Sequence, residues 1–108
     1  MLETLFGTKS RENVLLYLCA RESGYAREIS RYYKCGFNPI RRQLERMELG
    51  GVVVSKTVGR TILYTLNPRY PFITQLKALL ERSIQFLDVS ERLRLMNVRK
   101  RPRRVGKP

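Results

Sequence analysis

Residues 25–66 read YAREISRYYKCGFNPIRRQLERMELGGVVVSKTVGRTILYTL, and this stretch decides the fold. Ala26, Ile29 and Tyr33 recur at the spacing of one helical face, which predicts a short first helix. Gly36 follows and can supply the positive φ that a tight turn between two helices requires. The stretch therefore begins as a helix, a turn and a second helix.

The second helix is predicted to begin with Asn38 as its N-cap and Pro39 at its first helical position. Its buried face is formed by apolar residues at one helical spacing: Phe37, Ile40, Leu44 and Met47. The opposite face carries Asn38, Arg42, Glu45 and Arg46, with Arg41 and Gln43 on the flanks. Gly50 and Gly51 are expected to end this arginine-rich helix.

A β-hairpin is predicted after the second helix. Residues 52–54 and 61–66 are rich in β-branched and aromatic side chains, as strands are. Residues 55–60 contain Gly59 and are expected to form the connecting loop. Lys56 and Arg60 would then lie near its tip, so the hairpin would present a basic end.

Apolar helices are predicted on both sides of this stretch. A first helix, capped by Ser10 and ending near Gly24, is apolar on most sides and should lie at the centre of the core. Cys19 is expected to be a small core residue within it. A long last helix should run from Phe72 to Met96, with a break or bend at residues 88–90. We expect residues 1–70 to form the main domain, 71–96 a C-terminal helix and 97–108 a disordered basic tail.

The chain is strongly basic. It has 22 Lys and Arg against 9 Asp and Glu, a net charge of +13. Residues 97–108 hold six of these cations and no acid, which leaves 16 cations against the 9 acids, or +7, in residues 1–96. This excess favours a polyanionic partner, nucleic acid before an anionic membrane. The alternative is a charge that serves solubility alone.

Composition argues against an enzyme, a metal protein and a membrane protein. The chain has no histidine, and its two cysteines, Cys19 and Cys35, cannot complete a zinc site within one chain. A site shared across a dimer through Cys35 and carboxylates is the alternative, and Lys34 is expected to lower the pKa of that thiol. The longest apolar run, residues 14–20, is too short to span a membrane, and residues 1–4 lack the features of a signal peptide. We expect a cytoplasmic protein with no cofactor and no identifiable small-molecule effector.

The order of helix, turn, arginine-bearing helix and hairpin is typical of domains that place one helix in a DNA groove. The candidate DNA-binding residues are Asn38, Arg41, Arg42, Gln43, Arg46, Lys56 and Arg60. Arginine pairs with guanine edges or with phosphates, and the sequence leaves both roles open. Asn38 has two alternatives as well, reading an adenine or capping its own helix, and we favour the cap.

The last helix carries more apolar surface than one small domain needs. Its stripe consists of Phe72, Leu76, Leu79, Leu80, Ile84 and Leu87. It is expected to pack back on the first helix and also to pair with the same helix of a second copy. Such a homodimer would set two DNA-binding helices about one DNA turn apart.

Several segments in order resemble an ArsR-like family of prokaryotic winged helix-turn-helix regulators. They are residues 5–11 (LFGTKSR), 25–29 (YAREI), 38–44 (NPIRRQL), 58–61 (VGRT) and 66–72 (LNPRYPF). The resemblance covers about residues 4–85 and implies a mainly helical winged helix-turn-helix fold with a three-helix core and a two-stranded wing. It further implies a DNA-binding homodimer that represses or activates transcription. Metal sensing is not implied, because the cysteine clusters of the metal-sensing members are missing.

Two other functions remain open at this stage. A chromatin protein that binds DNA without sequence preference would also be strongly basic. A winged-helix adaptor that binds protein or RNA would use the exposed last helix as its docking surface. Steep salt dependence favours DNA binding over the adaptor, and a defined sequence motif favours a regulator over a chromatin protein.

Overall fold

A computed structural model describes residues 1–97 of the chain. The helices are α1 (Glu3–Phe6), α2 (Lys9–Arg21), α3 (Ala26–Tyr33), α4 (Phe37–Leu49), α5 (Ile73–Gln85) and α6 (Val89–Asn97). The strands are β1 (Gly24–Tyr25), β2 (Val53–Val58) and β3 (Thr61–Leu66). The predicted fold class, mainly helical with a small β-hairpin, is confirmed, and a third strand that was not predicted, β1, pairs with the hairpin.

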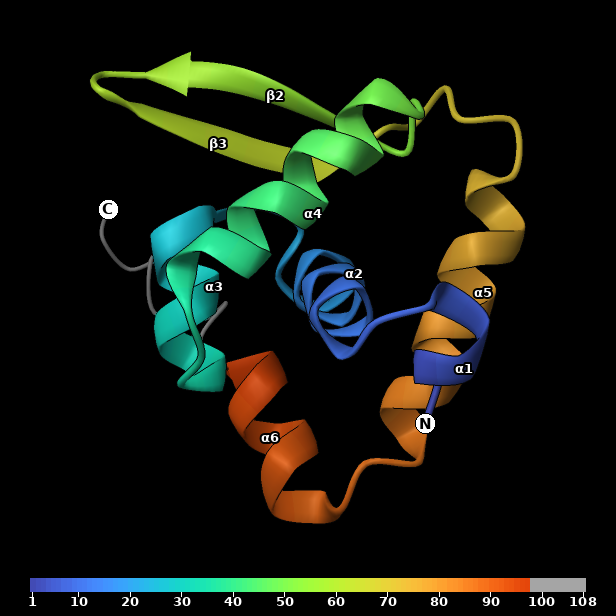
Figure 1. The fold of residues 1–108 in the computed structure, drawn as a ribbon. Helices are drawn as coiled ribbons and strands as arrows, with labels where there is room; N and C mark the ends of the chain where they lie inside the picture. The colour runs from blue at the N-terminus through green and yellow to red at the C-terminus, as the bar shows by residue number, and fades with distance from the viewer. Residues whose placement is uncertain (98–108) are drawn as a thin grey trace, which may run out of the picture.

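Helix α2 forms the centre of the core, as its apolar sequence predicts. Figure 1 shows it end-on, with α3, α4, α5 and α6 arranged around it. Val14, Leu15 and Leu18 are at most 2% exposed. Apolar residues from every surrounding helix join the same cluster: Ile29, Ile40, Leu44, Leu80, Ile84 and Leu95. The C-terminal helices therefore share one core with residues 1–70.

The ends of α2 differ from the prediction. Thr8, not Ser10, is the N-cap, and its hydroxyl accepts a hydrogen bond from the backbone N–H of Arg11 at 3.0 Å. At the other end Glu22, with φ of 73°, takes the left-handed position expected at Gly24. Gly24 is needed for space instead, because a Cβ there would lie 2.8 Å from the ring of Tyr17.

The turn between α3 and α4 also uses a residue other than the predicted glycine. Lys34 is left-handed, with φ of 56°, and its N–H donates to Arg31 O while the next N–H, of Cys35, donates to Ser30 O. These bonds satisfy the last carbonyls of α3, which is what a left-handed C-cap achieves. Gly36 is extended (φ −67°, ψ 145°) and is the N-cap of α4, so its predicted positive φ is wrong.

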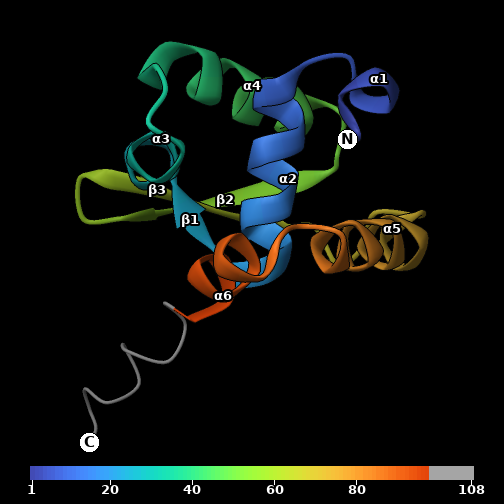
Figure 2. The ribbon, with the colours of Figure 1, turned by 90° about the horizontal axis from the view of Figure 1, so that it is seen from below.

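The three strands form one antiparallel sheet in the order β1-β3-β2. The hairpin is longer than predicted, because β2 continues to Val58 and only Gly59 and Arg60 make the turn. Gly59 has φ of 61°, which a short hairpin turn requires. The hairpin projects past α3, and α5 lies on the opposite side of α2 (Figure 2). This projection leaves Ile62 48% exposed, whereas Tyr64 on the same face is buried.

The C-terminal segment is two helices, broken where the sequence predicts. Asp88 Oδ1 accepts hydrogen bonds at 2.9 Å from the Glu91 N–H and the Ser90 hydroxyl, and these bonds start α6. Arg94 then lies over the Tyr32 ring, 4.2 Å from its centroid, and fixes α6 against α3. Within residues 1–97 no helix is long and apolar enough to cross a membrane. The predicted tail lies outside the described residues, apart from Asn97.

Candidate nucleic-acid interface

The outer face of α4 is exposed and basic. Asn38, Arg41, Arg42 and Arg46 are all exposed, while Leu44 on the inner face is fully buried. At 100° per residue, Arg42 lies almost directly opposite Leu44. The helix runs alongside the hairpin at the surface of the molecule, as Figure 1 shows. The helical stripe in the sequence therefore placed this face correctly.

Gln43 is an exception among the predicted DNA-binding residues. It is only 6% exposed, and its Oε1 accepts a hydrogen bond from Arg11 Nε at 2.9 Å. The same arginine donates to the backbone O of Phe6 at 2.9 Å, so Gln43 belongs to a link between α1, α2 and α4. The structure therefore does not place Gln43 on the exposed face of α4 with Arg42.

The capping role favoured for Asn38 is wrong. The N-cap of α4 is Gly36, two residues earlier, and no side chain caps the helix. Asn38 therefore lies in the first turn with an exposed side chain. Its amide is available for the other role considered, since asparagine can pair with the edge of an adenine.

A concavity of about 320 Å³ lies between α3, α4 and the hairpin. Three arginines from three elements line it: Arg27 of α3, Arg41 of α4 and Arg60 of the hairpin turn. Glu45 lines it as well, and its carboxylate accepts a hydrogen bond from Arg41 Nη1 at 3.0 Å. A surface that gathers cations from three elements in this way can follow the phosphates of a nucleic acid backbone.

Arg27 lines this concavity, although it is not among the candidate residues predicted from the sequence. Its guanidinium lies over the ring of Phe37, 4.4 Å from the centroid, which orients the side chain beside the start of α4. The only sequence signal was its spacing, since Arg27 falls outside the apolar face formed by Ala26, Ile29 and Tyr33. That spacing indicates that the side chain of Arg27 is on the outside of α3, but it does not indicate which neighbouring element the side chain contacts.

Lys56 and Arg60 do not lie together at the tip as predicted. Arg60 is in the turn, whereas Lys56 is in β2 and pairs with Leu63. Its neighbour Ser55 donates to Glu48 of α4 at 2.6 Å, so that face of the hairpin is turned toward α4. Because successive side chains alternate across a strand, Lys56 lies on the face away from α4.

The predicted dimerisation residues divide into two sets. Leu80 and Ile84 are buried in the chain's own core, and Leu76 and Leu87 are half-buried against it. Phe72 and Leu79 are 62% and 37% exposed, and Phe86, which the sequence analysis omitted, is 63% exposed. Phe72 and Phe86 are the N-cap and C-cap of α5 and Leu79 lies midway between them, so the three residues form an exposed apolar stripe along the helix. A groove of about 500 Å³ lies beside it, lined by Phe72, Leu76, Leu79, Phe6, Leu15, Met47 and Arg46, among others.

The two cysteines lie on separate parts of the fold, Cys19 in α2 and Cys35 in the turn before α4. Within residues 1–97 no group of three His, Cys, Asp or Glu is placed to hold a metal ion. Cys35 is exposed at the turn before α4, and partial burial raises the pKa of its thiol, contrary to the lowering expected from Lys34. Cys19 is half-buried and lies at the margin of the core.

No family model matches the chain, and no curated protein matches its sequence. Solved structures do match. Reduced HlyU from Vibrio cholerae has a TM-score of 0.63 at 20% identity, over 81% of this chain and 85% of HlyU. YusO from Bacillus subtilis gives 0.58 at 18% identity, over 98% of this chain and 83% of YusO. The transcriptional regulator SlyA gives 0.53 at 17% identity, over 96% of this chain and 79% of SlyA.

The chain has the winged helix-turn-helix fold. One of these neighbours, SlyA, is a transcriptional regulator, and in this chain the hairpin of β2 and β3 forms the wing of the fold. At these identities the likeness shows the fold alone. The expected ArsR-like affiliation is finer than the likeness supports.

Proposed function

We propose that this protein is a sequence-specific DNA-binding transcriptional regulator, ArsR-like in type and without enzymatic activity. The observation that carries this proposal is the meeting of Arg27, Arg41 and Arg60 in one concavity beside α4. Winged-helix regulators among the structural neighbours add support. Binding to chromosomal DNA would place the protein in the cytoplasm.

In this proposal α4 enters the major groove. Arg42 and Asn38 point outward from its exposed face and are the residues that would contact base edges. Arg27 and Arg60 flank the helix on α3 and the wing, where they would contact phosphates on either side. Arg46, which lines the groove toward α5, would reach a phosphate at the other edge of the helix.

A homodimer is the second part of the proposal. The stripe of Phe72, Leu79 and Phe86 leaves three large apolar side chains exposed along one side of α5, and an exposed apolar surface of this kind is typical of contacts between subunits. A second copy of the chain would cover this stripe and the groove beside it. Two α4 helices would then address two half-sites related by a two-fold axis.

The test is a selection from random DNA duplexes with the full chain at physiological salt, followed by binding of the selected and a scrambled duplex across a salt series. A regulator yields a defined motif, prefers the selected duplex, and shows a steep fall of affinity with salt. Steep salt dependence without a motif would favour the chromatin protein. Affinity that hardly changes with salt would favour the adaptor and contradict DNA binding.

A further inference from the structure

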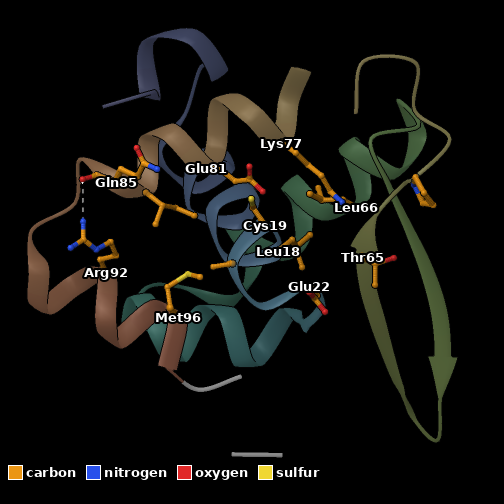
Figure 3. A pocket seen from close by; sticks show the side chains of 13 residues that line it. Leu18, Cys19, Glu22, Thr65, Leu66, Lys77, Glu81, Gln85, Arg92 and Met96 are labelled. Atoms are coloured by element: carbon orange, nitrogen blue, oxygen red, sulfur yellow. Dashed lines mark hydrogen bonds between the residues drawn. The ribbon is translucent and has the colours of Figure 1, made fainter. Parts of the chain in front are cut away.

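A pocket of about 770 Å³ opens between α2, β3, α5 and α6 (Figure 3). It is lined by a different edge of α5 from the exposed apolar stripe, because Lys77 and Glu81 lie on one side of the buried Leu80 and Leu79 on the other. A partner copy seated on the stripe would therefore leave the pocket open. Its volume is within the range of small-molecule sites.

The floor of the pocket is apolar. Leu18 of α2, Leu66 of β3, Ile84 of α5 and Met96 of α6 line it, so four elements contribute. The thiol of Cys19 lies at the centre of the view in Figure 3, below Glu81. Burial raises the pKa of this thiol, and the Glu81 carboxylate raises it further, so Cys19 stays protonated at neutral pH. The cysteine acts here as a small lining group and not as a nucleophile.

Lys77 and Glu81 form the wall above this floor. They are four residues apart on α5, a spacing at which opposite charges commonly pair. Within residues 1–97, however, neither side chain takes part in an ion pair. Figure 3 shows the two heads directed apart, Lys77 toward Leu66 and Glu81 toward Cys19. The pocket thus presents one cation and one anion, separated, over an apolar surface.

The two ends of the pocket add charges of both signs. Glu22 lines it at the end of α2. Arg92 lines it from α6, and its Nη1 donates to Gln85 O at 3.4 Å, which joins α6 to α5 at that end. The lining therefore carries two acids and two bases, and it favours a ligand that carries both signs of charge over a simple cation or anion.

We propose that this pocket binds a small zwitterion with an apolar body, such as an amino acid with a large apolar side chain or an apolar dipeptide. The ligand's ammonium would bind Glu81, its carboxylate would bind Lys77, and its apolar part would cover Leu18, Ile84 and Met96. Charge-assisted hydrogen bonds at both ends would select the zwitterion. This inference goes beyond DNA binding and does not depend on it.

The test is isothermal titration calorimetry of the full chain, without DNA, against L-phenylalanine and leucyl-leucine. Each probe has two matched analogues: N-acetylation removes the ammonium, and amidation removes the carboxylate. We expect at least one zwitterion to bind, and both of its analogues to bind at least about tenfold more weakly, since each loses one charge-assisted contact. Absence of binding by both zwitterions, or equal binding by the analogues, would overturn the proposal.

Two variants test whether the ligand binds in this pocket. Glu81→Gln and Lys77→Gln change exposed side chains on α5, and each should weaken zwitterion binding by about tenfold. Glu3→Gln removes an exposed acid from α1 and is the matched control, expected to bind as the unmodified chain does. Thermal unfolding of each variant checks that the fold is retained. Unchanged affinity in both pocket variants would contradict the assignment.

Discussion

Arg11 and Gln43 join α2 to the helix that we place in the DNA groove, through a 2.9 Å hydrogen bond between Nε and Oε1. The bond is partly buried, because Gln43 is only 6% exposed, whereas Arg42, one residue earlier in α4, is exposed. Gln43 therefore fixes α4 against α2, whereas the neighbouring Arg42 faces outward.

This contrast predicts opposite effects of two alanine substitutions. Gln43→Ala should lower the free energy of unfolding by about 1–3 kcal/mol, because the partly buried guanidinium of Arg11 loses its hydrogen bond to Gln43. Arg42→Ala should change stability by less than about 0.5 kcal/mol and should cost about 1–3 kcal/mol on the selected duplex, with loss of sequence discrimination. Urea unfolding and fluorescence anisotropy measure the two effects. Equal loss on selected and scrambled duplexes would contradict a base-reading role for Arg42.

Two alanine substitutions in the wing provide a second comparison. Arg60→Ala should weaken binding to all duplexes alike and reduce the slope of log affinity against log salt by about one, as loss of a phosphate contact does. Lys56→Ala should have a smaller effect, because Lys56 lies on the face of the hairpin away from α4. Salt titrations of both variants measure the slopes. A larger slope change for Lys56 than for Arg60 would place the DNA on the opposite face of the wing.

Arg27 tests whether α3 takes part in binding. Arg27→Ala should reduce affinity for selected and scrambled duplexes equally, since we place it against the backbone beside α4. Arg69→Ala, which removes an exposed cation between β3 and α5, is the control and should leave affinity unchanged. If the two variants behave alike in the salt series, the concavity between α3, α4 and the wing is not the DNA surface.

The apolar periodicity of the sequence was enough to place the exposed face of α4, because Ile40 and Leu44 must be buried and Arg42 then faces outward. The same periodicity did not predict the burial of Gln43. A polar residue is buried only when a partner satisfies its hydrogen bonds, and here that partner, Arg11, is distant in the sequence and cannot be found from spacing. The prediction of a positive φ at Gly36 was wrong for a related reason. Glycine is the residue that most readily takes positive φ, but the position is fixed by where α3 ends, and that residue is Lys34.

The two-residue strand β1 and the contact of Arg27 with Phe37 were beyond sequence reasoning. A strand of Gly24 and Tyr25 is too short to show any alternation, and it exists because β3 offers an edge beside it. The placement of Arg27 in the site likewise follows from how α3 crosses α4, which is a tertiary property. The excess of apolar residues along α5 was predicted from the sequence, but which of them are buried was not. Leu80 and Phe86 are both apolar, and only packing against α2 makes Leu80 buried while Phe86 stays exposed.

Glu12 should make stability depend on pH. Burial of this carboxyl would raise its pKa, but the backbone N–H of Leu2, at 2.9 Å, and the ammonium of Lys9, at 3.3 Å, outweigh burial and hold the pKa below its ordinary value of 4.5. A group with a lowered folded-state pKa stabilises the protein above its unfolded-state pKa, and this stabilisation is lost as pH falls through the folded-state value. The free energy of unfolding should therefore fall as the pH is lowered from about 4.5, the ordinary value, through the lower folded-state pKa of Glu12.

Glu12→Gln checks this assignment. The variant should be less stable at pH 7 by about 2 kcal/mol, because its buried hydrogen bonds lose their charge. Its stability should also fall less steeply with acid than that of the unmodified chain. Urea unfolding at a series of pH values measures both. Parallel pH profiles for the two proteins would show that another carboxylate carries the acid sensitivity.

The exposed stripe on α5 predicts how the protein assembles. Phe86→Glu should raise the dimer dissociation constant by at least about thirtyfold, because it places a charge within a desolvated apolar contact. Val89→Glu introduces the same charge at a residue of α6 that is 60% exposed and outside the stripe, so it should leave the dimer intact. Sedimentation equilibrium measures both constants.

The Phe86 variant should also lose affinity for a palindromic duplex while keeping its affinity for a half-site, because each monomer retains its own α4. If the unmodified chain sediments as a monomer at micromolar concentration, the stripe does not join two copies, and the proposed two-fold reading of DNA fails with it.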